Sequence, residues 1–194
     1  MAWQKGILVV VIAICTMGMS GLSAQDRALA PADAAAIKQF DAAIAKYLAL
    51  RQGLLEEVRG PVPESTSTQL TQASDALAAA IQRSRSKARP GDLFVSPVVP
   101  VLKRLVVDVV ARQHLEPALA GIDDEQPGPA KPWVHMRFPA AAPLATMPPS
   151  LLAVLPRLPA SLEYRIVGGF LILRDVDAAL ILDVIPAAVP RQQF

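Results

Sequence analysis

The stretch between residues 31 and 60 has the apolar spacing of one long amphipathic helix. Apolar side chains recur there at alternating steps of three and four residues, which places them along one stripe. Arg51 fills the one polar slot of this stripe, and Gly60 with the neighbouring prolines ends the predicted helix. The stripe consists of Ile37, Phe40, Ile44, Tyr47, Leu54 and Val58.

Two further helices are predicted downstream, so that the first two helices form a helical hairpin. Thr66 and Gln69 have the spacing of a capping box, which predicts a second helix that ends near Pro90. Ser96 precedes a proline and an apolar run, so we expect it to be the N-cap of a third helix, which fades near Leu115.

The last segment changes to the alternating pattern of strands. Residues 162–167 alternate, Gly168-Gly169 supplies a two-residue hairpin turn, and residues 170–174 form the return strand. Ala178–Ile185 is a third apolar run. These runs predict a three-stranded antiparallel β-meander whose apolar face packs on the helices. The strand Ala178–Ile185 would then be an open edge available for docking.

Ten prolines in the 43 residues from 117 to 159 interrupt every regular period. We expect an extended arm that crosses the helical part, with one short helix at Pro149–Leu155; a disordered arm is the alternative. The predicted anchoring side chains are Leu144, Met147, Leu151, Leu152 and Leu155. The fold class is therefore α+β within one structural domain: helical region 25–116, proline-rich arm 117–159 and β-meander 160–194.

The N-terminal residues 1–24 have the layout of a secretory signal peptide. Lys5 precedes a 14-residue run dominated by apolar side chains, and small residues lead up to Ala24, after which we expect cleavage. The mature chain would then be periplasmic or secreted. An uncleaved membrane anchor is the alternative, because the uncharged stretch continues to Gln25.

Composition narrows the function classes without naming an activity. Charged residues make up 19% of the chain and the net charge is +2, which excludes a strongly basic nucleic-acid binder and a disordered polyelectrolyte. The single cysteine, Cys15, lies in the signal segment and excludes a disulfide scaffold. No nucleophile, metal or phosphate-binding motif occurs, so no catalytic residue, metal ligand or cofactor is predicted.

A basic run at the end of the second predicted helix is the candidate surface for an anionic partner. It consists of Arg83, Arg85, Lys87 and Arg89. A run of cations can bind anionic lipid or envelope polymer. The structural alternative is that these cations complement the negative end of the helix dipole.

Three acidic residues near the C-terminus could hold a hard cation such as calcium, namely Asp175, Asp177 and Asp183. The structural alternative is that Asp175 and Asp177 cap the turn between two strands. With Glu163 they are also the residues that a carboxylate-based hydrolase of envelope polymers would use.

Soft-metal ligands are suggested by Trp133, His135 and Met136 together with Met147. One histidine and scattered methionines form a poor ligand set, so these residues are interpreted as anchors of the arm. His114 is interpreted as a surface residue at the end of the third helix.

The C-terminal pattern LEYR at residues 162–165, LILRD at 171–175 and LILD at 180–183, followed by Ile185-Pro186, carries a resemblance. Together with the proline- and leucine-rich stretch 143–159, it resembles a group of exported bacterial proteins for which no activity is known. The resemblance implies export and this layout.

These observations predict a non-catalytic periplasmic protein that binds a protein or an envelope component, with no nucleic-acid partner. The alternatives are the hydrolase and a structural protein tethered by its uncleaved N-terminus. The oligomeric state stays open, because a helical stripe can pair within the chain or with a second copy.

Overall fold

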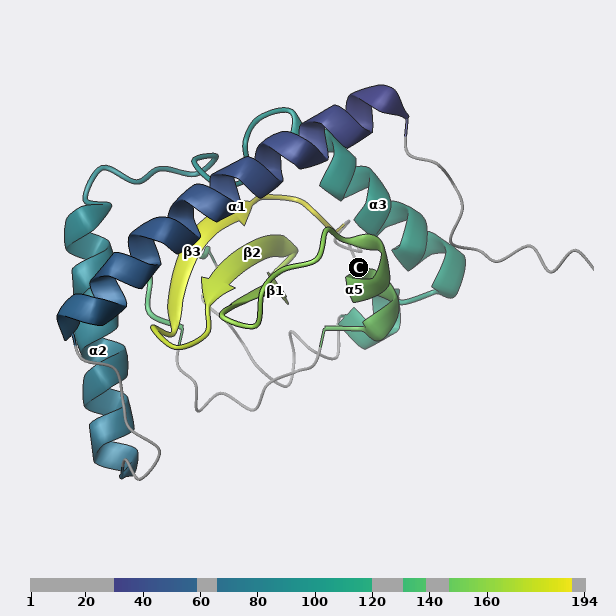
Figure 1. Cartoon of the computed structure of the whole chain (residues 1–194). Coiled ribbons are helices and arrows are strands. Elements are labelled where there is room, and N and C mark those ends of the chain that lie inside the picture. The colour runs from purple at the N-terminus through teal and green to yellow at the C-terminus, as the bar shows by residue number, and fades with distance from the viewer. Residues whose placement is uncertain (1–29, 59–65, 120–130, 139–146, 190–194) are drawn as a thin grey trace, which may run out of the picture.

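The computed structural model describes residues 30–58, 66–119, 131–138 and 147–189. It confirms the predicted α+β fold, with helices followed by a C-terminal three-stranded sheet (Figure 1). The elements are α1 (Pro31–Val58), α2 (Ser67–Ser84), α3 (Val98–Gln113), α5 (Pro149–Val154), β1 (Leu162–Val167), β2 (Phe170–Asp175) and β3 (Leu180–Ile185). The predicted signal segment and the anchor Leu144 lie outside the described residues.

The sheet is an antiparallel meander in the order β1-β2-β3. Gly168 and Gly169 join β1 to β2 with φ values of 54° and 80°, the left-handed conformation that a two-residue hairpin turn of type I′ requires. In the ladder between β2 and β3 the register skips Leu182, which forms a β-bulge. The bulge places Asp183 opposite Leu173.

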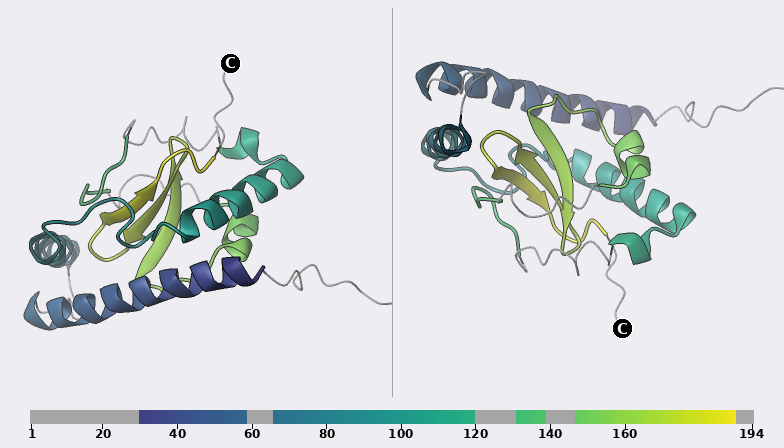
Figure 2. Two further views of the ribbon diagram at one scale, coloured as in Figure 1. Left: turned by 90° about the horizontal axis from the view of Figure 1, so that it is seen from above. Right: turned by 90° about the horizontal axis from the view of Figure 1, so that it is seen from below.

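One face of the sheet carries the main hydrophobic core, which α1, α3 and α5 surround (Figure 2). Phe94, from the segment between α2 and α3, stacks on Phe40 of α1 with ring centroids 5.8 Å apart. It also stacks on Tyr164 of β1 at 6.4 Å. Burial of these apolar side chains stabilises the fold and fixes the helices against the sheet.

The helical stripe predicted for α1 is confirmed, because Phe40, Ile44, Tyr47 and Leu54 are all buried. Arg51 is buried with them and is only 7% exposed. The capping box at the start of α2 is confirmed as well, since Thr66 and Gln69 exchange their side-chain and backbone hydrogen bonds.

Two predicted helix boundaries are wrong. α2 ends at Ser84 and does not continue to Pro90, because the chain turns at Arg85, whose side chain enters the protein instead of following the helix surface. Ser96 is not the N-cap of α3. That position is taken by Pro97, which already has helical dihedral angles and makes no side-chain cap hydrogen bond.

The predicted open edge at β3 is also wrong over part of its length. Residues 131–138 of the arm run beside β3: the His135 N–H donates to the Ile181 carbonyl at 2.8 Å, and the Ile181 N–H donates to the Met136 carbonyl at 2.9 Å. This part of the arm therefore covers the beginning of the β3 edge. Met136 and Phe138 pack on the second, smaller apolar face of the sheet.

The arm prediction holds better around α5. The short helix is confirmed at Pro149–Val154, and Met147, Leu151 and Leu155 are buried as predicted. Leu152 is the exception, since it is 46% exposed. Because α5 has only six residues, which is fewer than two turns, a single side of it can face the core.

Candidate functional site

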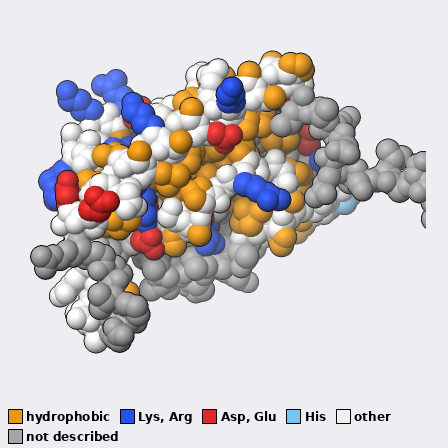
Figure 3. Space-filling model, in the orientation of Figure 1, with side chains coloured by type: hydrophobic (Ala, Val, Ile, Leu, Met, Phe, Trp, Pro, Cys, Tyr) orange, Lys and Arg blue, Asp and Glu red, His pale blue; other side chains and the backbone are white. Residues whose placement is uncertain are grey.

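The predicted basic run divides into an exposed part and an inward part. Arg83, Lys87 and Arg89 are exposed, and none of them forms an ion pair with a carboxylate in the described part of the chain. We call these three residues the basic corner. Figure 3 shows Lys and Arg side chains gathered at the upper left of the molecule, near the end of α2. The positive charge of the basic corner therefore faces solvent.

Arg85 behaves differently from the other three cations. Its guanidinium lies over the Tyr47 ring, 5.5 Å from the centroid, and its Nη1 donates to the Leu182 carbonyl at 3.4 Å. Its Nη2 is buried and has no hydrogen-bond partner among the described residues. Arg85 thus fastens the end of α2 to α1 and β3, and it does not belong to the exposed surface.

A buried ion network joins α1 to the end of β2. Asp175 has no exposed surface; it accepts hydrogen bonds from the Tyr47 hydroxyl at 2.6 Å, from Arg51 Nε at 2.7 Å and from the Ala178 N–H at 2.9 Å. Arg51 also pairs with Asp177. The hydrogen bond to Ala178 confirms that Asp175 caps the turn between β2 and β3.

The network shifts the pKa values of both of its residues on α1, Tyr47 and Arg51. Burial raises the pKa of the Tyr47 hydroxyl far above its ordinary value, and the negative charge and hydrogen bond of Asp175 raise it further. Burial by itself lowers the pKa of Arg51, but the hydrogen bonds and charges of Asp175 and Asp177 outweigh burial and raise it. Tyr47 therefore stays protonated, and Arg51 stays charged to compensate Asp175.

Asp183 lies apart from this network and is held by backbone groups. Its carboxylate accepts hydrogen bonds from the N–H groups of Gly91, Leu93 and Phe94 at 2.8–2.9 Å and from its own neighbour Val184 at 2.7 Å. These contacts fix the segment between α2 and α3 against β3. The three predicted acidic residues therefore do not converge on one cation, and the described residues contain no group of three or more His, Cys, Asp or Glu arranged to hold a metal.

Glu163 lies on the second face of the sheet between two arginines. Arg165 Nη2 donates to its carboxylate at 2.7 Å, and Arg174 on β2 donates to its other oxygen. Burial raises the pKa of Glu163, but the hydrogen bonds and charges of the two arginines outweigh burial and hold it below its ordinary value. Glu163 therefore pairs with Arg174 across the ladder of β1 and β2, and its ionised carboxylate is already engaged.

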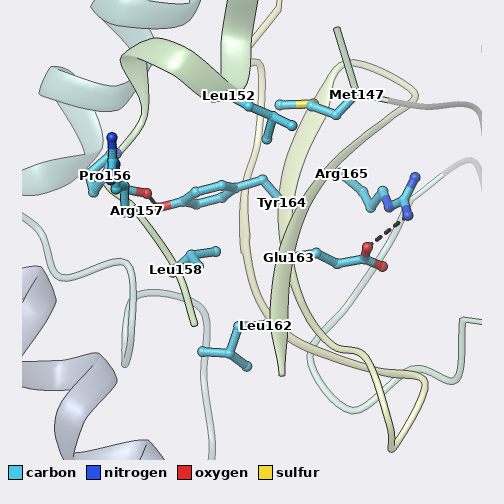
Figure 4. A pocket seen from close by; sticks show the side chains of 9 residues that line it. All are labelled: Met147, Leu152, Pro156, Arg157, Leu158, Leu162, Glu163, Tyr164 and Arg165. Carbon is cyan, nitrogen blue, oxygen red and sulfur yellow. Dashed lines mark hydrogen bonds and ion pairs between the residues drawn. The ribbon is translucent and has the colours of Figure 1, made fainter. Parts of the chain in front are cut away.

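A groove of about 380 Å³ runs along the outer edge of β1. Its lining includes the four consecutive residues 162–165 of β1. Because successive strand residues point to opposite faces of a sheet, a groove that touches all four must lie at the strand's edge. Figure 4 shows the side chains around it, with Tyr164 and Arg165 on opposite sides of the strand. The other lining residues are Met147, Leu152, Pro156, Arg157 and Leu158.

The soft-metal residues do not form a ligand set in the described structure. Trp133 is 58% exposed, and Met147 lies at the β1 groove. His135 lies against α2, where Gln82 donates to its carbonyl at 3.0 Å. Burial and the charge of Arg85 lower the pKa of His135. His114 is exposed and ends α3 in the left-handed conformation.

Sequence analysis predicted neither the β1 groove nor the set of backbone N–H groups that donate to the Asp183 carboxylate. Neither has a local signal, because the groove depends on which strand of the meander is left at the edge. The polar slot at Arg51 was a usable signal, since a cation in an apolar stripe needs a buried carboxylate as its partner. No described helix is long and apolar enough to cross a membrane.

Comparison with known proteins adds no assignment: no family model, no curated protein and no solved structure matches this chain.

Proposed function

We propose that this chain is an exported, non-catalytic protein of the bacterial envelope that binds an anionic phospholipid surface through its basic corner. The observation that carries the proposal is that Arg83, Lys87 and Arg89 are exposed and form no ion pair with a described carboxylate. Export is supported by the N-terminal sequence pattern alone.

The distribution of the charge favours an array of anions over a single small anion. The three cations are spread over seven residues, from the last turn of α2 into the exposed segment that follows it. Each Lys or Arg near an anionic membrane contributes about 1 kcal/mol of attraction at physiological ionic strength. Three of them give a binding free energy of about 3 kcal/mol, which is weak and reversible and suits a peripheral contact.

The buried carboxylates support a binding role over the hydrolase alternative. Asp175 and Asp183 have no exposed surface and are held by Arg51 and by backbone N–H groups respectively. Glu163 is paired with two arginines, and Asp177 with Arg51. Each of these carboxylates therefore already serves a contact that stabilises the fold.

The test measures binding of the chain to vesicles of phosphatidylglycerol, with phosphatidylcholine vesicles as the neutral comparison. The triple variant Arg83→Glu, Lys87→Glu, Arg89→Glu should bind the anionic vesicles about 100-fold more weakly, because three attractive charges are lost. The matched control is Lys38→Glu, Arg112→Glu, Lys131→Glu, which changes the net charge equally at exposed positions elsewhere.

Equal loss in the two triple variants would show that only net charge matters and would contradict the proposal. So would equal binding of the native chain to the two vesicle types. Displacement of the native chain from vesicles by soluble polyphosphate, with tighter binding to the polymer, would point to an envelope polymer as the partner. If the cations only complement the helix dipole, the triple variant should lower the melting temperature without changing binding.

A further inference from the structure

We infer that the outer edge of β1 pairs with β1 of a second copy of this chain, which joins two three-stranded sheets into one across a twofold axis. In the part of the chain that the structure describes, the sheet ends at β1, whereas arm residues 135–138 are hydrogen-bonded beside residues 179–181 at the β3 edge. An edge strand presents unused backbone groups to any strand that can align with it. The inference is independent of the proposed lipid contact, which lies at the end of α2.

The backbone groups that point outward from β1 follow from the hairpin register. Val167 and Phe170 flank the two-residue turn, so they form a hydrogen-bonded pair, and every second pair along the ladder does the same. The N–H and carbonyl groups of Leu162, Tyr164 and Ile166 therefore point away from β2. These are the groups that a second strand would meet.

The side chains of β1 are complementary to themselves in one antiparallel register. When Tyr164 faces Tyr164 of the second copy, Leu162 faces Ile166, and Glu163 faces Arg165 on both sides of the twofold axis. The pair of Glu163 and Arg165 then lies at a non-hydrogen-bonded position, where side chains across two strands are closest. The twofold axis thus creates two contacts between Glu163 and Arg165 on one face of the joined sheet. The aromatic and aliphatic side chains meet on the other face.

The neighbouring registers are disfavoured by the same charges. If Tyr164 faced Leu162, Glu163 would lie opposite Glu163 of the second copy. If Tyr164 faced Ile166, Arg165 would lie opposite Arg165. Like charges directly across two strands are destabilising, so one register is selected.

The ladder in this register is short. Tyr164 exchanges two hydrogen bonds with its counterpart, and the Ile166 N–H of each copy donates to the Leu162 carbonyl of the other. The Leu162 N–H takes no part, because it donates to the Pro159 carbonyl within its own chain at 2.9 Å. Four backbone hydrogen bonds result. Leu152, which lines the groove and is 46% exposed, would add an apolar contact with the second copy. An interface of this size predicts a dissociation constant in the micromolar range or weaker.

The capacity of Glu163 for a further partner agrees with this arrangement. Its side chain is 23% exposed, and its two oxygens accept hydrogen bonds from Arg165 and Arg174. An ionised carboxylate offers about four acceptor positions, so Glu163 can accept a further hydrogen bond from an arginine of a second copy.

The test measures the self-association of the full chain, as isolated from cells, by analytical ultracentrifugation. It compares the native chain with two variants in which the charge of residue 163 or of residue 165 is reversed. The native chain should form a dimer at about 100 µM. Arg165→Glu should weaken self-association at least about tenfold, because Glu163 then faces a second carboxylate across the interface. Glu163→Arg should do the same, because two guanidinium groups then face each other. An equimolar mixture of the two variants should restore the dimer, since opposite charges face each other again.

A native chain that stays monomeric at every concentration would overturn the inference, and so would a dimer that both single variants leave unchanged. If a variant fails to fold, amide hydrogen exchange of the native chain provides the second readout. Exchange at Tyr164 and Ile166 should slow as the concentration rises, whereas exchange at Ile181, which is already bonded to the arm, should not change. Concentration-independent exchange at Tyr164 and Ile166 would also overturn it.

Discussion

The two edges of the sheet are completed in different ways. At the β3 edge, arm residues 135–138 are hydrogen-bonded beside residues 179–181, and Asp183 holds the segment between α2 and α3 through backbone N–H groups. The edge of β1 instead borders a groove with a largely apolar lining. Contacts within the chain thus cover part of the β3 edge, whereas the β1 edge is the one at which the self-pairing proposed above would occur.

The largest loss of stability is expected from Asp183→Asn, which disrupts the contacts of this carboxylate at the β3 edge. The carboxylate accepts several backbone N–H groups, and the amide nitrogen of asparagine would face donors and leave at least one of them unsatisfied. The variant should lose about 3 kcal/mol of unfolding free energy in urea titration. Asp92→Asn is the control, because that exposed carboxylate accepts the Arg89 N–H within a local turn; equal losses in the two variants would contradict the special role of Asp183.

A somewhat smaller effect is expected from Asp175→Asn, at the turn that leads into β3. The variant removes the charge opposite Arg51, but Arg51 retains Asp177 as a partner. We expect a loss of about 2 kcal/mol in the same titration. Tyr47→Phe removes a single hydrogen bond to Asp175 and should lose about 1 kcal/mol. A Tyr47→Phe loss larger than that of Asp175→Asn would show that the hydroxyl, and not the ion pair, holds the turn.

The smallest effect is a pH dependence that comes from His135 on the arm. Burial and the charge of Arg85 hold the pKa of His135 below its ordinary value of 6.5. The unfolded chain therefore binds a proton at a higher pH than the folded chain, so stability is lost as the pH falls from about 6.5 toward the lower pKa of the folded state. The pKa of Glu163 is also lowered, but its window lies at lower pH, below about 4.5.

The His135 prediction is checked by melting temperatures at pH 7.5 and pH 5.5. His135→Asn should reduce the difference between the two values, because asparagine does not titrate. It also tolerates the positive φ of 70° at this position. His114→Asn is a matched control, since His114 has a φ of 50° and an exposed side chain. If His114→Asn reduced the difference as much as His135→Asn, the pH dependence of the melting temperature would not come from His135.

Much of the fold could be predicted because its signals are local. The stripe of α1, the capping box at Thr66 and the glycine pair at 168–169 each depend on residues within a few positions of one another. Local dihedral preferences and apolar spacing determine such elements before any long-range contact forms. The end of α2 was misplaced because Arg85 leaves the helix surface for Tyr47, which is a contact between distant residues.

The candidate sites were predicted less well, because proximity in the chain is a poor guide to proximity in space. The basic run was found from sequence, but only the structure separates inward Arg85 from the three exposed cations. The acidic residues 175, 177 and 183 looked like one cluster, yet the bulge in β3 directs Asp183 to a different set of partners.

The sequence by itself determined the α+β order of elements, the burial of the α1 stripe and the presence of a cation within it. Only the tertiary structure decided which carboxylate compensates Arg51, which edge the arm covers and which edge borders a groove. The physical reason is that the spacing of apolar residues determines which face of a helix or strand is buried, and this spacing is a property of each element separately. The pairing of buried charges and strand edges is fixed only when distant segments meet and every buried polar group must find a partner.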